Sequence, residues 1–182
     1  MRRLMAFLES RIDAAERRSL PIVVGDSAHP FDATEPGAIR GLHALLETLK
    51  RHAGLELVIT SRSPLLLREI DSLVELDQSH AVAVDVPLPC IDPVSGEALD
   101  LHAAEPQQCL WMVRKLAEQG LTTRVVLPAD LDLGAEEVLR PLVNAARAHG
   151  AFDVAPTAGS SSRLLRQLRL ENDLPRHLPG RG

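Results

Sequence analysis

The chain repeats one pattern of hydrophobic and polar positions four times: a short apolar run, a turn with polar side chains, and an amphipathic stretch with apolar residues at helical spacing. Short continuous apolar runs are typical of strands buried in a parallel sheet, and amphipathic stretches predict helices that cover such a sheet. The repeats span residues 21–50, 56–76, 81–119 and 123–149.

The apolar runs predict five strands, and the helical spacing predicts a helix before the first strand and one after each strand. Ser63 is expected to cap the helix after the second strand, with Pro64 at its first helical position. The expected strands lie around residues 22–24, 55–59, 81–86, 123–127 and 152–155. The expected helices lie around residues 4–18, 42–49, 64–74, 110–119, 138–149 and 162–170.

Strands that are separated by helices must be joined by crossover connections, which makes them parallel in one sheet. The pattern leaves open whether this sheet is an open doubly wound sheet or an incomplete barrel. In both architectures the loops at the carboxyl ends of the strands collect the functional groups. We expect a single α/β domain over residues 1–173, with a loose tail rich in proline and glycine over residues 174–182.

Length and composition narrow the class of protein. A chain of 182 residues with 45% hydrophobic residues can bury one substantial core. A net charge of −5, with three phenylalanines, one tryptophan and no tyrosine, argues against nucleic-acid binding. Charged residues interrupt the N-terminal segment, so we expect neither a membrane partner nor an export signal. Cys90 and Cys109 form no CxxC pair, which favours a cytoplasmic protein over a disulfide framework or a zinc ribbon.

The loop after the first strand places three acids and a histidine close together: Asp26, His29, Asp32 and Glu35. Such side chains can bind a metal ion or transfer protons. Short polar side chains beside glycine and proline are also common in turns, where they bond to the neighbouring backbone. A small metal-assisted hydrolase that uses His29 and nearby acids is therefore one hypothesis.

The loop after the second strand combines hydroxyl groups with a guanidinium and the amides of a helix N-terminus. This combination suits a carboxylate or a phosphate. Capping alone explains Ser63, but capping does not require Arg62, so a ligand-binding role stays open for this turn and is the strongest such candidate in the sequence. The candidate ligand-binding residues are Asp26, Glu35, Ser61, Arg62 and Ser63.

Both loops resemble segments of the spore photoproduct lyase-like branch of the radical SAM superfamily. The family has a turn of the form TDPYQPxE, and in the stretch 28–35 Pro30 and Glu35 match it, Phe31 nearly matches, and His29 replaces an aspartate. The family's TKS turn, followed by a pattern like RDIDLL, is similar to residues 61–73. Shorter similarities to the family's LDP and EP elements occur at residues 91–93 and 105–106.

The resemblance implies a partial parallel (β/α) barrel of about five strands that lacks the first barrel strand, with S-adenosylmethionine as the cofactor that the family uses. Family members hold an iron-sulfur cluster through CxxxCxxC, whose three thiolates leave one iron open. That motif does not occur in this sequence, so we expect no cluster on this chain and assign no catalytic residue.

Three functional hypotheses follow. The favoured one is a degenerate relative that serves as a non-catalytic small-ligand-binding or interaction domain, because the family's turns are weakened beyond the missing cluster motif. The second is the C-terminal part of a split or truncated enzyme whose cluster is held by another chain, and the third is the hydrolase. The missing strand would leave an open barrel edge where a second copy or a partner chain could pair.

Overall fold

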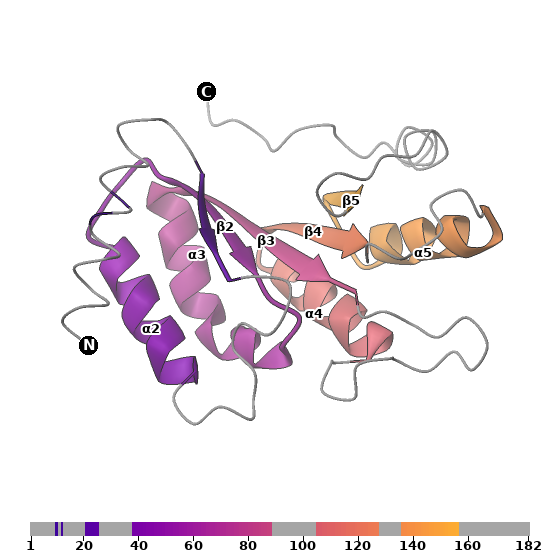
Figure 1. Ribbon diagram of the computed structural model, residues 1–182, viewed down its shortest axis with the longest axis horizontal. Coiled ribbons are helices and arrows are strands. Elements are labelled where there is room, and N and C mark those ends of the chain that lie inside the picture. Colours follow the sequence, from indigo (N-terminus) through magenta and orange to yellow (C-terminus); the bar gives the residue numbers. More distant parts are fainter. Residues whose placement is uncertain are drawn as a thin grey trace.

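The computed structural model describes Ser10, Ile12 and residues 21–25, 38–88, 105–127 and 136–156, which form an α/β unit around a five-stranded parallel sheet (Figure 1). The strands are β1 (Ile22–Val24), β2 (Glu56–Thr60), β3 (Ala81–Pro87), β4 (Thr122–Leu127) and β5 (Asp153–Pro156). The helices are α2 (Ala38–Leu49), the 3-10 helix η1 (Pro64–Glu69), α3 (Ile70–Ser79), α4 (Pro106–Glu118) and α5 (Glu136–Ala148).

The predicted succession of strands and helices is confirmed between residues 22 and 156, with strand ends shifted by about one residue. Ser10 and Ile12 are helical, as expected for the opening helix, and Ile12 is buried in the core. The rest of that helix, the closing helix expected at residues 162–170 and the predicted tail lie outside the described residues.

The strand order β1-β2-β3-β4-β5 decides between the two architectures that the pattern left open. A doubly wound sheet reverses its strand order at a switch point, whereas here each strand lies beside the next one in the sequence. Right-handed crossovers of this kind place successive helices on the same face of the sheet. The topology is therefore compatible with a partial barrel.

The core lies between the helices and one face of the sheet. Every second residue of a strand, such as Leu57 and Ile59 in β2, belongs to one buried cluster with residues from the helices, while the alternate residue Val58 does not. Figure 1 shows α2, α3 and α4 along the same side of the sheet. The sheet thus has a face that packs on the helix core and a second face, here called the opposite face.

The segment after β2 differs from the single helix that the sequence predicts. Ser63 does cap it, because its Oγ accepts a hydrogen bond from the Leu65 N–H at 3.4 Å. The first turns, however, form the 3-10 helix η1, and the α-helix begins only at Ile70. Short 3-10 stretches are frequent at helix ends. Among the described helices, none combines the length and the apolar character needed to cross a membrane.

Candidate functional site

A row of polar residues crosses four neighbouring strands on the opposite face of the sheet. Thr60 of β2 pairs with Asp85 of β3, Asp85 pairs with Arg124 of β4, and Arg124 pairs with Asp153 of β5. Residues that are paired in a parallel sheet lie at the same level and point to the same face. We call Thr60, Asp85, Arg124 and Asp153 the polar row.

The levels beside the polar row are mostly apolar. The next level toward the carboxyl ends of the strands holds Pro87, Val126 and Ala155, and the level on the other side holds Val58, Ala83 and Thr122. Charged side chains between apolar levels are uncommon in sheets, because burial penalises a charge unless a partner compensates it. The polar row is therefore a specific feature of the opposite face.

Asp85 and Arg124 form the centre of the polar row. Arg124 donates from Nε to Asp85 Oδ1 at 2.6 Å and from Nη2 to Asp85 Oδ2 at 2.7 Å. Their side chains remain 14% (Asp85) and 23% (Arg124) exposed. A bidentate pair of this kind fixes the plane of the guanidinium and is among the stronger hydrogen-bonded contacts in proteins.

The other two members of the polar row differ in burial. Asp153 is buried, and its Oδ1 accepts a hydrogen bond from the Val154 N–H at 2.7 Å. Thr60 is only partly buried, at the carboxyl end of β2. The polar row thus offers a hydroxyl group, a guanidinium and two carboxylates within one level of the sheet, which are groups that recognise small polar molecules.

The turn that the sequence singled out, Ser61 to Ser63, follows Thr60 directly and is tied to the polar row. The Ser61 N–H donates to the Asp85 main-chain oxygen at 2.9 Å. The buried Ser61 Oγ accepts from the Ser63 N–H at 3.1 Å. The structure therefore brings three of the predicted site residues, Ser61, Arg62 and Ser63, next to the polar row.

The amides at the start of η1 are already engaged. Leu65 N–H donates to Ser63 Oγ, and Leu66 N–H donates to the Ser63 main-chain oxygen at 3.0 Å. The expectation that this helix start offers free amides is wrong for these two groups, since Ser63 accepts from both. Arg62, the third candidate residue of this turn, is partly buried and follows Thr60 by two positions.

Cys109 lies in α4 behind this turn and is fully buried, with its Sγ 4.0 Å from the Arg62 main-chain oxygen. Burial raises the pKa of the Cys109 thiol to about 11, although the positive charge of Arg62 acts in the opposite direction. An iron-sulfur cluster is held by several cysteine thiolates close together. Cys109 is the one cysteine among the described residues, and Cys90 lies outside them.

The loop after β1 is described only at its start. Gly25 has a φ of 92°, a left-handed conformation that favours glycine, and it follows Val24, the partner of Ile59. This loop therefore leaves the sheet beside Thr60. The predicted site residues Asp26 and Glu35, together with His29, lie outside the described residues.

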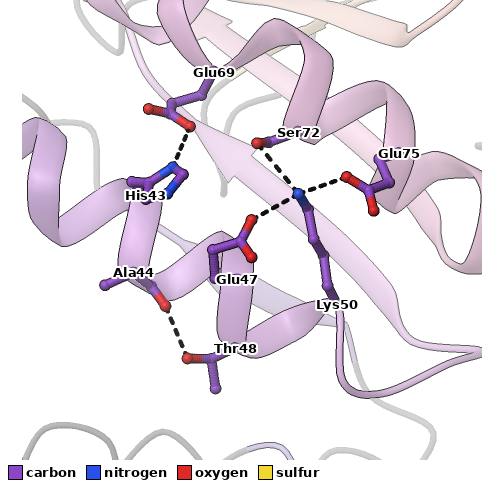
Figure 2. Close-up of polar contacts among 8 residues, drawn as sticks. All are labelled: His43, Ala44, Glu47, Thr48, Lys50, Glu69, Ser72 and Glu75. Atoms are coloured by element: carbon purple, nitrogen blue, oxygen red, sulfur yellow. Dashed lines mark hydrogen bonds and ion pairs between the residues drawn. The ribbon is translucent and has the colours of Figure 1, made fainter.

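A second polar cluster joins α2 to η1 and α3 at the surface (Figure 2). Lys50 Nζ lies 2.7 Å from Glu47 Oε1 and 2.6 Å from Glu75 Oε2. His43 Nδ1 lies 2.9 Å from Glu69 Oε2. The hydrogen bond from Lys50 lowers the pKa of Glu47, and the bonds to Glu47 and Glu75 raise the pKa of Lys50. The His43–Glu69 and Lys50–Glu75 pairs connect α2 and its end to η1 and α3, on the helix side of the sheet.

Sequence reasoning missed the polar row, although a signal was present. Asp85 and Arg124 each interrupt a strand that otherwise reads as apolar or β-branched. A charge inside such a run indicates a partner on a neighbouring strand. Within the described part of the chain, no group of three or more histidine, cysteine, aspartate or glutamate side chains is placed to hold a metal ion.

Comparisons with known proteins give no family assignment. No protein-family model matches the chain, and no curated protein matches its sequence.

Proposed function

We propose that this chain is a non-catalytic domain that binds a small polar molecule at the polar row, on the opposite face of a partial-barrel sheet. The observation that carries this proposal is the bidentate Asp85–Arg124 pair between mostly apolar levels of that face. In a closed barrel this face would line the interior, and ligands of parallel α/β folds bind near the carboxyl ends of the strands. Thr60 and the Ser61–Ser63 turn lie at that end of β2.

The chemistry of the polar row favours a ligand that carries both donor and acceptor groups. The guanidinium of Arg124 has five N–H donors, of which Asp85 engages two, and the carboxylates accept from amino or hydroxyl groups. S-adenosylmethionine has an amino-acid portion and hydroxyl groups, and it is the cofactor that the radical SAM resemblance implies. It is therefore the first ligand to test, within the proposal that the chain is a degenerate radical SAM-like domain.

Binding without turnover is the favoured form of the proposal because the sequence contains no CxxxCxxC motif and the family's turns are weakened beyond it. A split enzyme would obtain its cluster from another chain, and the hydrolase hypothesis depends on His29. Both alternatives stay predictions, because the described residues test neither of them.

Calorimetric titration of the purified full chain with S-adenosylmethionine, free amino acids and sugar phosphates tests the proposal. We expect saturable binding of at least one of these compounds. Thr60→Val removes one hydroxyl from the polar row and is expected to weaken binding by about two- to tenfold, the usual range for one hydrogen bond. The proposal fails if none of these compounds binds.

Thr122→Val is the matched control, because Thr122 pairs with Ala83 at the level of the opposite face before the polar row, toward the amino end of β4. Thr122→Val also removes a threonine hydroxyl from the opposite face, but it leaves the four residues of the polar row unchanged. Equal losses of affinity in the two variants would contradict the placement of the ligand.

The role as an interaction domain is a second candidate, and it is favoured by β1, which lies at the edge of the sheet among the described strands. Val23 of β1 points to the opposite face and is 61% exposed, which is unusual for a valine inside a strand. We propose a second copy of the chain as the occupant of this edge. Sedimentation velocity over a range of concentrations should show a dimer that Val23→Lys weakens. Trp111→Gln, which alters an exposed residue on α4, should leave the dimer intact.

A further inference from the structure

His80 is a titratable side chain that is 1% exposed and takes no part in the proposed binding site. It caps the C-terminus of α3 and immediately precedes β3. A histidine in the core is unusual, because its charged form loses its hydration there. Its hydrogen bonds therefore determine which form of the ring the fold accepts.

The Leu55 N–H donates to His80 Nδ1 at 3.3 Å. Because Nδ1 accepts this bond, it carries no proton, and the neutral ring holds its proton on Nε2. Within the described part of the chain, His80 Nε2 is buried and has no hydrogen-bond partner. The Leu55 contact thus selects one neutral form of the ring.

Two main-chain bonds surround this contact. Gly54 N–H donates to the Ser79 oxygen at 2.8 Å, and Ala81 N–H donates to the Leu55 oxygen at 2.9 Å. Together with the Leu55–His80 bond, they tie the loop between α2 and β2 to the junction between α3 and β3. We call these three bonds the loop latch.

We propose that the loop latch is sensitive to acid: a proton that binds His80 Nδ1 turns this acceptor into a donor facing the Leu55 N–H, so the latch opens locally while the centre of the sheet stays folded. The step is a protonation by solvent, with no other bond made or broken covalently. Protonation would also leave a charged ring in a buried site, which makes the closed latch less stable relative to the open one.

Most of the surroundings of His80 also disfavour its protonated form. Burial lowers the pKa of His80 below its ordinary value of 6.5; the Leu49 carbonyl opposes this shift, and the charge of His52 adds to it. Of the acids on the adjoining elements, Asp77 accepts a hydrogen bond from the Val82 N–H at 3.2 Å, and Glu56 is exposed. Arg51, in the loop after α2, is exposed as well.

The direction of the pH effect follows from this lowered pKa. The open form, with an ordinary histidine, takes up the proton before the closed form does. Opening therefore becomes about tenfold more favourable for each pH unit below about 6.5, until the pKa of the closed form is reached. Above that range the latch does not respond to pH.

Amide hydrogen exchange of the full chain between pH 7.5 and 5.0, corrected for the intrinsic pH dependence of exchange, tests the proposal. We expect the amides of Gly54, Leu55 and Ala81 to lose protection by about tenfold per pH unit below 6.5. The amides of Val84 and Val86, in the centre of β3, should keep theirs. Equal loss of protection in both groups would show global unfolding and overturn the proposal.

His80→Asn keeps an acceptor near the Leu55 N–H but does not titrate, so its latch should be independent of pH. His149→Asn is the matched control, since His149 also follows the C-terminus of a helix, with its Nδ1 2.8 Å from the Ala145 oxygen. It should behave as the wild type does. The same pH response in His80→Asn and the wild type would overturn the proposal.

Because His80→Asn alters a buried site, the imidazole proton resonances of the wild type provide a test that needs no variant. The His80 ring should titrate below pH 6.5. A His80 ring that titrates in the folded protein at or above 6.5 would overturn the proposal.

Discussion

Arg124 and Asp85 face each other across β4 and β3 with both carboxylate oxygens engaged, at 2.6 and 2.7 Å. The two residues are paired in the register of β3 and β4, so their side chains add a second contact between strands that the main-chain hydrogen bonds already join. It lies on the face opposite the helix core, where the packing of the helices does not hold the strands together. The pair therefore contributes to the stability of the sheet as well as to the proposed binding site.

Arg124→Met is expected to destabilise the fold by about 2–4 kcal/mol, because it leaves the carboxylate of Asp85 mostly buried and without its cation. Urea unfolding followed by far-UV circular dichroism measures this loss. Removal of one partner is costly because the remaining charge keeps its desolvation penalty and loses its compensation.

The double variant Asp85→Leu with Arg124→Met removes both charges and serves as the control. It should recover most of the lost stability, because a well-packed apolar pair can replace an ion pair of similar volume. A double variant that is less stable than Arg124→Met alone would contradict this account of the pair.

The strands of this fold could be predicted because their signal is local. Runs such as residues 81–84 are apolar throughout, and short apolar runs of this kind are typical of strands that are buried on both faces. The order of the strands has no local signal, because it depends on where each crossover connection places the next strand. The same pattern of apolar runs also suits a doubly wound sheet. The order therefore became known only from the pairing of the strands.

The candidate site could be predicted only in part, for a related reason. The Ser61–Ser63 turn is a contiguous segment with a distinctive composition, so the sequence points to it directly. The polar row draws one residue from each of four strands, and its register depends on how the strands are staggered. Thr60 and Asp153, the members at its two ends, are ordinary residues at strand ends until the register places them beside Asp85 and Arg124.

Cys109 should be unreactive toward thiol reagents in the folded protein. Burial raises the pKa of its thiol to about 11, so at pH 8 only about 0.1% would be thiolate. In the Cys90→Ser variant, which leaves one thiol, we expect negligible labelling by a thiol reagent at pH 8 until urea unfolds the chain. Prompt labelling without denaturant would contradict the burial of this side chain.

The same raised pKa predicts a loss of stability in alkaline solution. The unfolded chain releases the Cys109 proton near pH 9, while the folded chain retains it up to about pH 11, so unfolding becomes more favourable as the pH rises between these values. Urea unfolding of Cys90→Ser from pH 8 to 10.5 measures the effect. Cys90→Ser with Cys109→Ala is the control that should lack this component of the pH dependence.

His43 is expected to titrate above its ordinary pKa of 6.5. The hydrogen bond to Glu69 raises the pKa of His43, and the charge of that carboxylate adds to the effect. The stabilisation from this pair is thus fully present below pH 6.5 and is lost as the pH rises through the raised pKa. The NMR titration of the His43 imidazole should shift toward 6.5 in Glu69→Gln. In Glu137→Gln, which alters an exposed acid at the start of α5, it should not move.

Gly150 ends α5 with a φ of 84°, and a Cβ added to it would meet the Ala117 Cβ of α4 at 2.9 Å. Gly120, which follows α4, has a φ of 80°, but a Cβ there would meet no atom within 4 Å. Both Gly→Ala variants should be destabilised by the left-handed backbone, and Gly150→Ala should lose about 1–3 kcal/mol more because α4 and α5 must move apart. Thermal and urea unfolding of the two variants separate the steric cost from the conformational one. Equal losses in the two variants would mean that α4 and α5 are not in close contact at this position.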